Sequence, residues 1–378
     1  GSLLKKREGG FGRRRRRRTD AKRRAVGLTD APQARNPLGV TLESPFINFQ
    51  TRLSECSFPN KGGASYPKDR IVENARYSYI LRHGKEDDMK IKKPMLYSEP
   101  KQASLGFCLW NIGEKASLFS EQSDFLRAAF DVGFRIFDAA ESYGKGGAEE
   151  VAGEVFRSLR DEVRLGSKVS PSSIDPDDVY GSVVRACEES LRRLQTDYMD
   201  MYTLHSPENS EDWAEILDAF LDLKEDGKIK NFGVSYFDAE DLSEWLTLDG
   251  AEQTAVCESY FTLANRTDEC DLLPLCRSKG IYLISYPRLA MYQTSFQDSV
   301  LKRIAADRGV TPAQIALAWQ LSFKGTGAFV IPFSRAQTQA FFDSRRIELK
   351  PDELQALDAR FPRPCKKRIS LGERRASV

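Results

Sequence analysis

Residues 134–144 read FRIFDAAESYG, and this stretch decides the expected fold. A short apolar run ends at Asp138 and is followed by a polar loop that contains Tyr143. Seven other short apolar runs recur along the chain, separated by longer stretches that include amphipathic helical patterns. The eight runs are residues 105–110, 134–139, 163–169, 199–204, 231–235, 255–260, 282–286 and 328–331.

The alternation of short apolar runs with helical segments predicts parallel strands joined by helical crossovers. Eight such repeats are the number at which a parallel sheet closes into a (β/α)8, or TIM, barrel. An open doubly wound sheet is the structural alternative, and it often has a glycine-rich first turn. Residues 110–113 read WNIG after the first run, without a G-x-G-x-x-G pattern. The sequence therefore predicts an α/β TIM barrel.

Charge divides the chain into a barrel with basic ends. Residues 1–40 hold 13 Lys and Arg against three carboxylates, which predicts a disordered or partner-bound tail. Residues 41–102 are expected to form an extension that wraps the domain, and residues 103–362 the barrel. Residues 363–378, with six Lys and Arg against one Glu, form a short basic C-terminal tail.

The run from Arg13 to Arg18 leaves three interpretations open. It is a targeting sequence for a mitochondrion or plastid, an arm for an acidic partner, or a solvated tail. The acidic partner would be nucleic acid, an anionic membrane surface or an acidic protein. No apolar stretch is long enough for a transmembrane segment.

Cysteine and histidine usage bears on compartment and metal binding. The seven cysteines are scattered, with no C-x-x-C pair, which predicts reduced thiols in the cytoplasm or an organelle. Only two histidines are present, so no metal site is expected.

Four reactive side chains fall at the ends of three successive strands or in the loop that follows. They are Asp138, Tyr143, Lys168 and His205. Each alone has an ordinary structural interpretation, such as a turn cap, a loop residue, a solvated cation or a structural histidine. Because the carboxyl ends of barrel strands share one mouth, we expect the four to converge and form a catalytic group.

Carbonyl reduction is the chemistry that uses this set. Hydride transfer to a carbonyl carbon leaves an oxyanion, to which the phenol of Tyr143 can give its proton as a general acid. The ammonium of Lys168 is expected to lower the phenol's pKa from its usual value near ~10. Asp138 would hold Lys168, and His205 would hydrogen-bond the carbonyl oxygen.

Three segments resemble the aldo-keto reductase family. FRIFDAAESYG is similar to the family pattern in which Asp and Tyr lie five residues apart. Residues 188–207 (EESLRRLQTDYMDMYTLHSP) resemble the stretch that leads to the family's catalytic His, and residues 228–235 (KIKNFGVS) its fifth strand. The similarity spans about residues 103–361. It implies reduction of aldehydes or ketones to alcohols with NADPH, or less often NADH.

The resemblance also implies residues that contact the nicotinamide. Ser235 is kept from the family's Ser-Asn pair, but Tyr236 replaces the Asn. Cys257, three residues before Tyr260, stands where the family has Gln, and a thiol substitutes poorly for an amide. Tyr286 matches the ring that stacks on nicotinamide. Trp110, at the end of the first strand, is expected to line the substrate pocket.

The phosphate region departs further from the family. Ser334 and Arg335 follow the eighth strand, where a Lys-Ser pair is usual. Loss of charge-assisted bonds to phosphate implies weak NADPH binding, a preference for NADH, or no cofactor. The alternative function is therefore a catalytically weak or inactive barrel that serves as an accessory subunit of a larger assembly, docked through its Arg-rich N-terminus. The intact quartet favours the enzyme.

Overall fold

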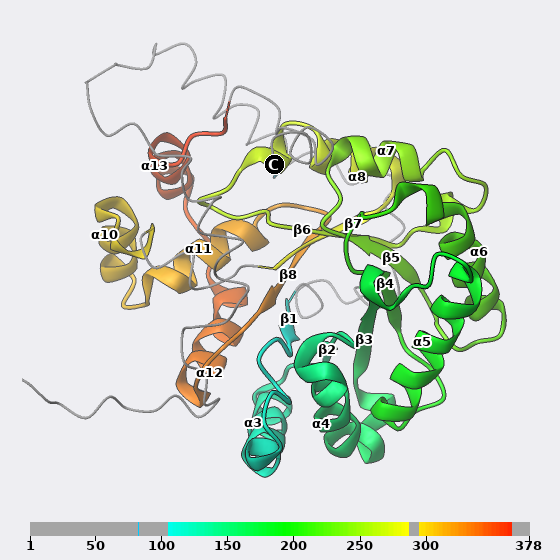
Figure 1. Cartoon of the computed structure of the whole chain (residues 1–378). Coiled ribbons are helices and arrows are strands. Elements are labelled where there is room, and N and C mark those ends of the chain that lie inside the picture. The colour runs from blue at the N-terminus through cyan, green and yellow to red at the C-terminus, as the bar shows by residue number, and fades with distance from the viewer. Residues whose placement is uncertain (1–81, 83–104, 287–294, 365–378) are drawn as a thin grey trace, which may run out of the picture. The chain divides into compact units, whose positions relative to one another are not determined.

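The computed structural model describes Arg82 and residues 105–286 and 295–364 (Figure 1). The predictions for residues 1–40, for all of 41–102 except Arg82, and for residues 365–378 lie outside the described residues.

Eight parallel strands form a closed barrel in the described part of the chain, in sequence order, with β1 pairing to both β2 and β8. The TIM-barrel prediction is confirmed, and each predicted strand is found with ends that differ from the prediction by at most two residues. The strands are β1 (Leu105–Cys108), β2 (Ile136–Asp138), β3 (Arg164–Val169), β4 (Met201–Leu204), β5 (Phe232–Ser235), β6 (Val256–Ser259), β7 (Tyr282–Ser285) and β8 (Thr326–Val330).

Helices surround the barrel on its outside (Figure 1). Their apolar faces pack onto the strands; α5, for example, buries Val179, Val183, Cys187 and Leu191 at helical spacing. The described helices are α3 (Phe119–Val132), α4 (Gly147–Phe156), α5 (Val179–Leu194), α6 (Trp213–Glu225), α7 (Ala239–Trp245), α8 (Leu272–Lys279), α10 (Ser299–Asp307), α11 (Pro312–Leu321), α12 (Arg335–Asp343) and α13 (Pro351–Arg360). None of them is long and apolar enough to cross a membrane.

Strand side chains alternate between two cores, because successive residues of a strand point to opposite faces. One core lies between the strands and the helices. The other fills the barrel interior and includes Cys108, Met201, Val256 and Phe329. On β6, Val256 belongs to the interior core and Cys257 to the outer one. The same alternation turns the next residue, Glu258, to the interior.

Arg82 is the described residue of the 41–102 segment, and it is buried against the outside of the barrel. Its guanidinium makes two hydrogen bonds, of 2.8 and 2.9 Å, to the carboxylate of Asp358 on α13. It also lies 4.5 Å from the ring centre of Phe323 and 5.3 Å from that of Trp319. These contacts anchor one point of the segment to the barrel.

Candidate active site

Lys168 is the centre of the site. It lies near the end of β3, is 2% exposed, and donates to the carboxylate of Asp138 and to the carbonyl oxygen of Ala139, the latter at 3.2 Å. Asp138 is the last residue of β2, and Ala139 directly follows it. Burial alone would lower the pKa of Lys168, but the carboxylates of Asp138 and Glu258 outweigh it and raise that pKa. The ammonium therefore stays charged.

A second carboxylate, which the sequence analysis missed, faces the same ammonium. Glu258 on β6 is 1% exposed, and its Oε2 lies 3.6 Å from Lys168 Nζ. The hydroxyl of Ser235, at the end of β5, donates to the same oxygen at 3.1 Å. Burial raises the pKa of Glu258 to about 7 in spite of Lys168. An acid within the apolar run of β6 was the signal that could have identified it.

Tyr143 and His205 lie beside the Lys168–Asp138 pair. Tyr143 opens a short 3-10 turn, Tyr143–Gly146, in the loop after β2, and its ring centre lies 5.9 Å from Lys168 Nζ. His205 directly follows β4, and its ring meets that of Tyr143 edge-on at 5.7 Å between centres. Ser142 Oγ lies 3.4 Å from His205 Nδ1. The structure thus brings the four predicted side chains together at one end of the barrel.

The acidity of Tyr143 differs from the expectation. Burial, and then the negative charge that Cys108, Asp138, Tyr236 and Glu258 can carry, raise the pKa of Tyr143 well above its usual value. The sequence predicted that Lys168 would lower this pKa. The pKa is instead raised, first because the phenol is fully buried and second because several acidic groups lie near it.

Aromatic rings line the mouth next to this group. Tyr236 directly follows β5 with a left-handed backbone, at a φ of +63°. Its ring centre lies 6.2 Å from that of His205, 5.0 Å from Tyr286 and 5.4 Å from Tyr260. Trp110 packs against the same interior core. Trp110, Tyr236 and Tyr286 therefore lie around the same interior core, and their contact with substrate or cofactor stays a prediction.

Cys257 is the predicted cofactor residue that the structure does not bring to the mouth. Its buried thiol belongs to the outer core and hydrogen-bonds with the thiol of Cys276 on α8. Cys257 faces away from the barrel interior because successive residues of a strand point to opposite faces, so it does not take the place predicted for it beside the nicotinamide. Glu258, instead of Cys257, faces the barrel interior.

Ser334 and Arg335 form a separate polar group at the start of α12. The hydroxyl of Ser334 accepts from the backbone N–H of Gln337 at 3.2 Å and so caps the helix. Arg335 is exposed and donates to the carbonyl oxygen of Asp124 at 3.4 Å. A cation at a helix N-terminus opposes the helix dipole, and an anion bound there would relieve that repulsion. The donor set suits a phosphate.

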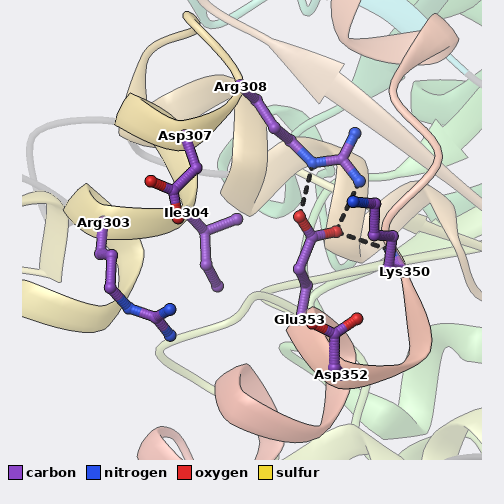
Figure 2. A pocket seen from close by; sticks show the side chains of 7 residues that line it. All are labelled: Arg303, Ile304, Asp307, Arg308, Lys350, Asp352 and Glu353. Carbon is purple, nitrogen blue, oxygen red and sulfur yellow. Dashed lines mark hydrogen bonds and ion pairs between the residues drawn. The ribbon is translucent and has the colours of Figure 1, made fainter.

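A cavity of about 250 Å³ lies elsewhere, between α10 and α13, and contains none of the predicted site residues (Figure 2). Its lining balances three cations against three carboxylates, and Arg308 is already paired with Glu353. The full lining is Arg303, Ile304, Asp307, Arg308, Lys350, Asp352 and Glu353. We assign no ligand to it.

Comparison with known proteins decides the family. The model of the Aldo/keto reductase family matches residues 104–360. The chain belongs to the aldo-keto reductase family. The methylglyoxal reductase YeaE of Escherichia coli is 35% identical to this aldo-keto reductase over 265 residues, which cover 69% of the chain and 92% of the relative. Prostaglandin F synthase 1 of Bos taurus is 28% identical, over 63% of the chain and 82% of the relative.

Solved structures agree with this assignment. An aldo-keto reductase from Klebsiella pneumoniae in complex with NADPH has a TM-score of 0.64 and 37% identity, and the match covers 70% of the chain and 93% of that protein. A structure of an aldo/keto reductase from the same organism with NADP and acetate has a TM-score of 0.65. The family prediction is confirmed. The alternative of an inactive accessory barrel is not favoured, because the named relatives are enzymes.

Proposed function

We propose that this aldo-keto reductase reduces small aldehydes and ketones to alcohols with NADPH, and that Tyr143 supplies the proton. The observation that carries the proposal is the buried Lys168–Asp138 ion pair, with the rings of Tyr143 and His205 beside it. An ammonium, a phenol and an imidazole at one mouth provide the groups that stabilise and protonate an oxyanion.

Each side chain has a defined task. Tyr143 Oη donates its proton to the carbonyl oxygen, and Lys168 stabilises the phenolate that remains. Asp138 holds the ammonium through the buried ion pair. The imidazole of His205 donates a hydrogen bond that orients the carbonyl oxygen. When bound, NADPH supplies the hydride.

Two groups of residues would hold NADPH. The ring of Tyr286 would stack on the nicotinamide. Tyr236, whose ring centre lies 5.0 Å from that of Tyr286, and Ser235 at the end of β5 would contact the cofactor beside it. Ser334 and Arg335, at the N-terminus of α12, would bind the phosphate of the adenosine end. The cation at this helix N-terminus fits an anionic ligand, which supports NADPH.

Small 2-oxoaldehydes are the substrate class that we propose first, because two of the enzymes similar to the chain are named methylglyoxal reductases. The test combines binding and turnover. Fluorescence titration should show saturable NADPH binding, and NADPH should be consumed when methylglyoxal is added. Absence of binding at millimolar NADPH, with correctly folded protein, would contradict the proposal.

Two further proposals concern the Arg-rich N-terminus, which lies outside the described residues. They are that it binds an acidic partner and that it directs the protein to an organelle. The charge of residues 1–40 supports contact with an acidic partner or import into an organelle. Deletion of residues 1–40 should abolish binding to anionic vesicles or RNA, or change the location of a fluorescent fusion. Unchanged binding and unchanged location would together remove both assignments.

A further inference from the structure

One ammonium and two carboxylates meet inside the barrel. Lys168 from β3 pairs directly with Asp138 from β2, and Glu258 from β6 stands 3.6 Å away from its Nζ. The side chains of Lys168 and Glu258 are 2% and 1% exposed, so water screens their charges little. In the part of the chain that the structure describes, Lys168 is the cation at ion-pair distance from Glu258.

The other groups around Glu258 do not neutralise it. Ser235 of β5 donates one neutral hydrogen bond. The thiol of Cys108 on β1 hydrogen-bonds with Asp138 instead. The phenols of Tyr143 and Tyr286 are close enough that an ionised Glu258 raises the pKa of both. When both carboxylates are ionised, the charge of the Lys168, Asp138 and Glu258 cluster is therefore −1.

This charge acts on the proton-transfer step. In carbonyl reduction the hydride adds to the carbonyl carbon, the C=O π bond breaks, and the oxygen takes the proton of Tyr143 Oη. The phenolate that remains carries the negative charge. A neutral cluster, in which Glu258 is protonated, stabilises this phenolate, whereas a cluster of charge −1 repels it.

We propose that Glu258 is a positioning residue for Lys168 whose state of protonation governs how readily Tyr143 gives its proton to the substrate. The inference rests on the proposed function of the site and deepens it. Reduction is faster when Glu258 carries a proton and slower when Glu258 is ionised. The fully buried position of Glu258 raises its pKa to about 7, so the change falls within the range in which the enzyme can be assayed.

The first experiment compares pH profiles of kcat and kcat/KM for methylglyoxal reduction between pH 5.5 and 9. The kcat of wild type should fall about tenfold above neutral pH. A change of one unit in the pKa of the Tyr143 phenol changes the rate of its proton transfer about tenfold. Glu258→Gln fixes a neutral side chain and should vary less than about twofold over the same range. A profile for Glu258→Gln that follows wild type would overturn the proposal.

A matched control is available in Glu149. This glutamate is also fully buried and paired with a cation, Arg193, but it lies on α4 in the outer layer of the barrel. Glu149→Gln should keep the wild-type pH profile if it folds, as judged by circular dichroism. If both variants lose the pH dependence of kcat, the loss of any buried carboxylate is enough to remove it. That result would also overturn the proposal.

The second experiment needs neither cofactor nor substrate. Protein labelled with ¹³C at glutamate carboxyls should show one buried resonance that titrates near neutral pH and is missing in Glu258→Gln. If that resonance reports an ionised carboxylate at every pH down to 5, the proposal fails even when the enzyme is active. If wild type reduces no carbonyl at any pH, the proposed function fails, and the titration still decides the state of Glu258.

Discussion

Lys168 and Glu258 face each other inside the barrel, with Nζ 3.6 Å from Oε2, although they come from strands that are not neighbours. Asp138 already neutralises the ammonium through a direct bond. The second carboxylate therefore leaves the site with more negative charge than positive when both acids are ionised. This relationship affects both proton transfer and stability, because a buried charge without a full partner is costly.

Asp138→Asn tests how the two carboxylates share Lys168. The substitution removes the direct bond but leaves Glu258 at ion-pair distance from Lys168. We therefore expect the free energy of unfolding to fall by only about 1–2 kcal/mol. A buried ion left without any partner would cost more, ~3–5 kcal/mol. Turnover should fall about 10- to 100-fold because Lys168 is less well placed. Urea unfolding and steady-state kinetics measure the two effects.

The double variant Asp138→Asn, Glu258→Gln provides the control for this sharing. It leaves Lys168 without a carboxylate, so its loss of stability should exceed the sum of the changes caused by the two single substitutions. Single changes that simply add up to that of the double variant would show that the two carboxylates act independently on Lys168.

Glu258 should also make the stability of the folded protein depend on pH. Its pKa rises from 4.5 to about 7 on folding, so the folded state holds this proton more tightly than the unfolded state. The contribution of Glu258 to stability is therefore greatest below pH 4.5 and declines as the pH rises to about 7, by on the order of 3 kcal/mol. Glu258→Gln should lack this decline. Parallel curves of unfolding free energy against pH for the two proteins would contradict the assignment.

Arg82 should contribute to the stability of the barrel. Arg82→Met keeps an apolar side chain against Phe323 but removes both bonds to Asp358, which retains Arg266 at 2.9 Å. We expect a loss of about 2–3 kcal/mol at pH 7, measured by urea unfolding.

The pH dependence of this loss identifies its cause. Burial acts to raise the pKa of Asp358, but the bonds from Arg82 and the charge of Arg266 outweigh it and hold the pKa below the usual 3.8. The stabilisation is therefore present above that value and disappears as the pH falls through the lower folded pKa. The difference between wild type and Arg82→Met should shrink as the pH falls below 3.8. An unchanged difference would assign the loss to packing.

Arg335 should contribute to the choice between NADPH and NADH. Its position at the N-terminus of α12 suits the extra phosphate of NADPH. Arg335→Ala should raise the Kd for NADPH about tenfold and leave that for NADH within about twofold. Arg346→Ala, which removes another exposed arginine, serves as the control. Equal weakening of both cofactors by Arg335→Ala would place the phosphate elsewhere.

Much of the fold was predictable from the sequence because its signals are local. Short apolar runs define the strands, and polar residues at their carboxyl ends define the mouth. That was enough to bring Asp138, Tyr143, Lys168 and His205 into one group.

The contribution of β6 was not predictable in the same way. Whether Cys257 or Glu258 faces inward depends on strand register, and one residue of error exchanges the two faces. The pairing of Glu258 with Lys168 also joins strands that are distant along the chain, so no local spacing indicates it. The raised pKa of Tyr143 follows first from its burial and then from the acidic groups around it, and both depend on the three-dimensional arrangement.

Tyr143→Phe tests the central claim most directly, because it removes the phenolic oxygen and keeps the ring beside Lys168 and His205. Single-turnover reduction of methylglyoxal by the NADPH-bound enzyme should slow by about 10³-fold or more, while the Kd for NADPH and the unfolding free energy stay close to those of wild type. Hydride transfer at the wild-type rate in this variant would show that Tyr143 is not the proton donor.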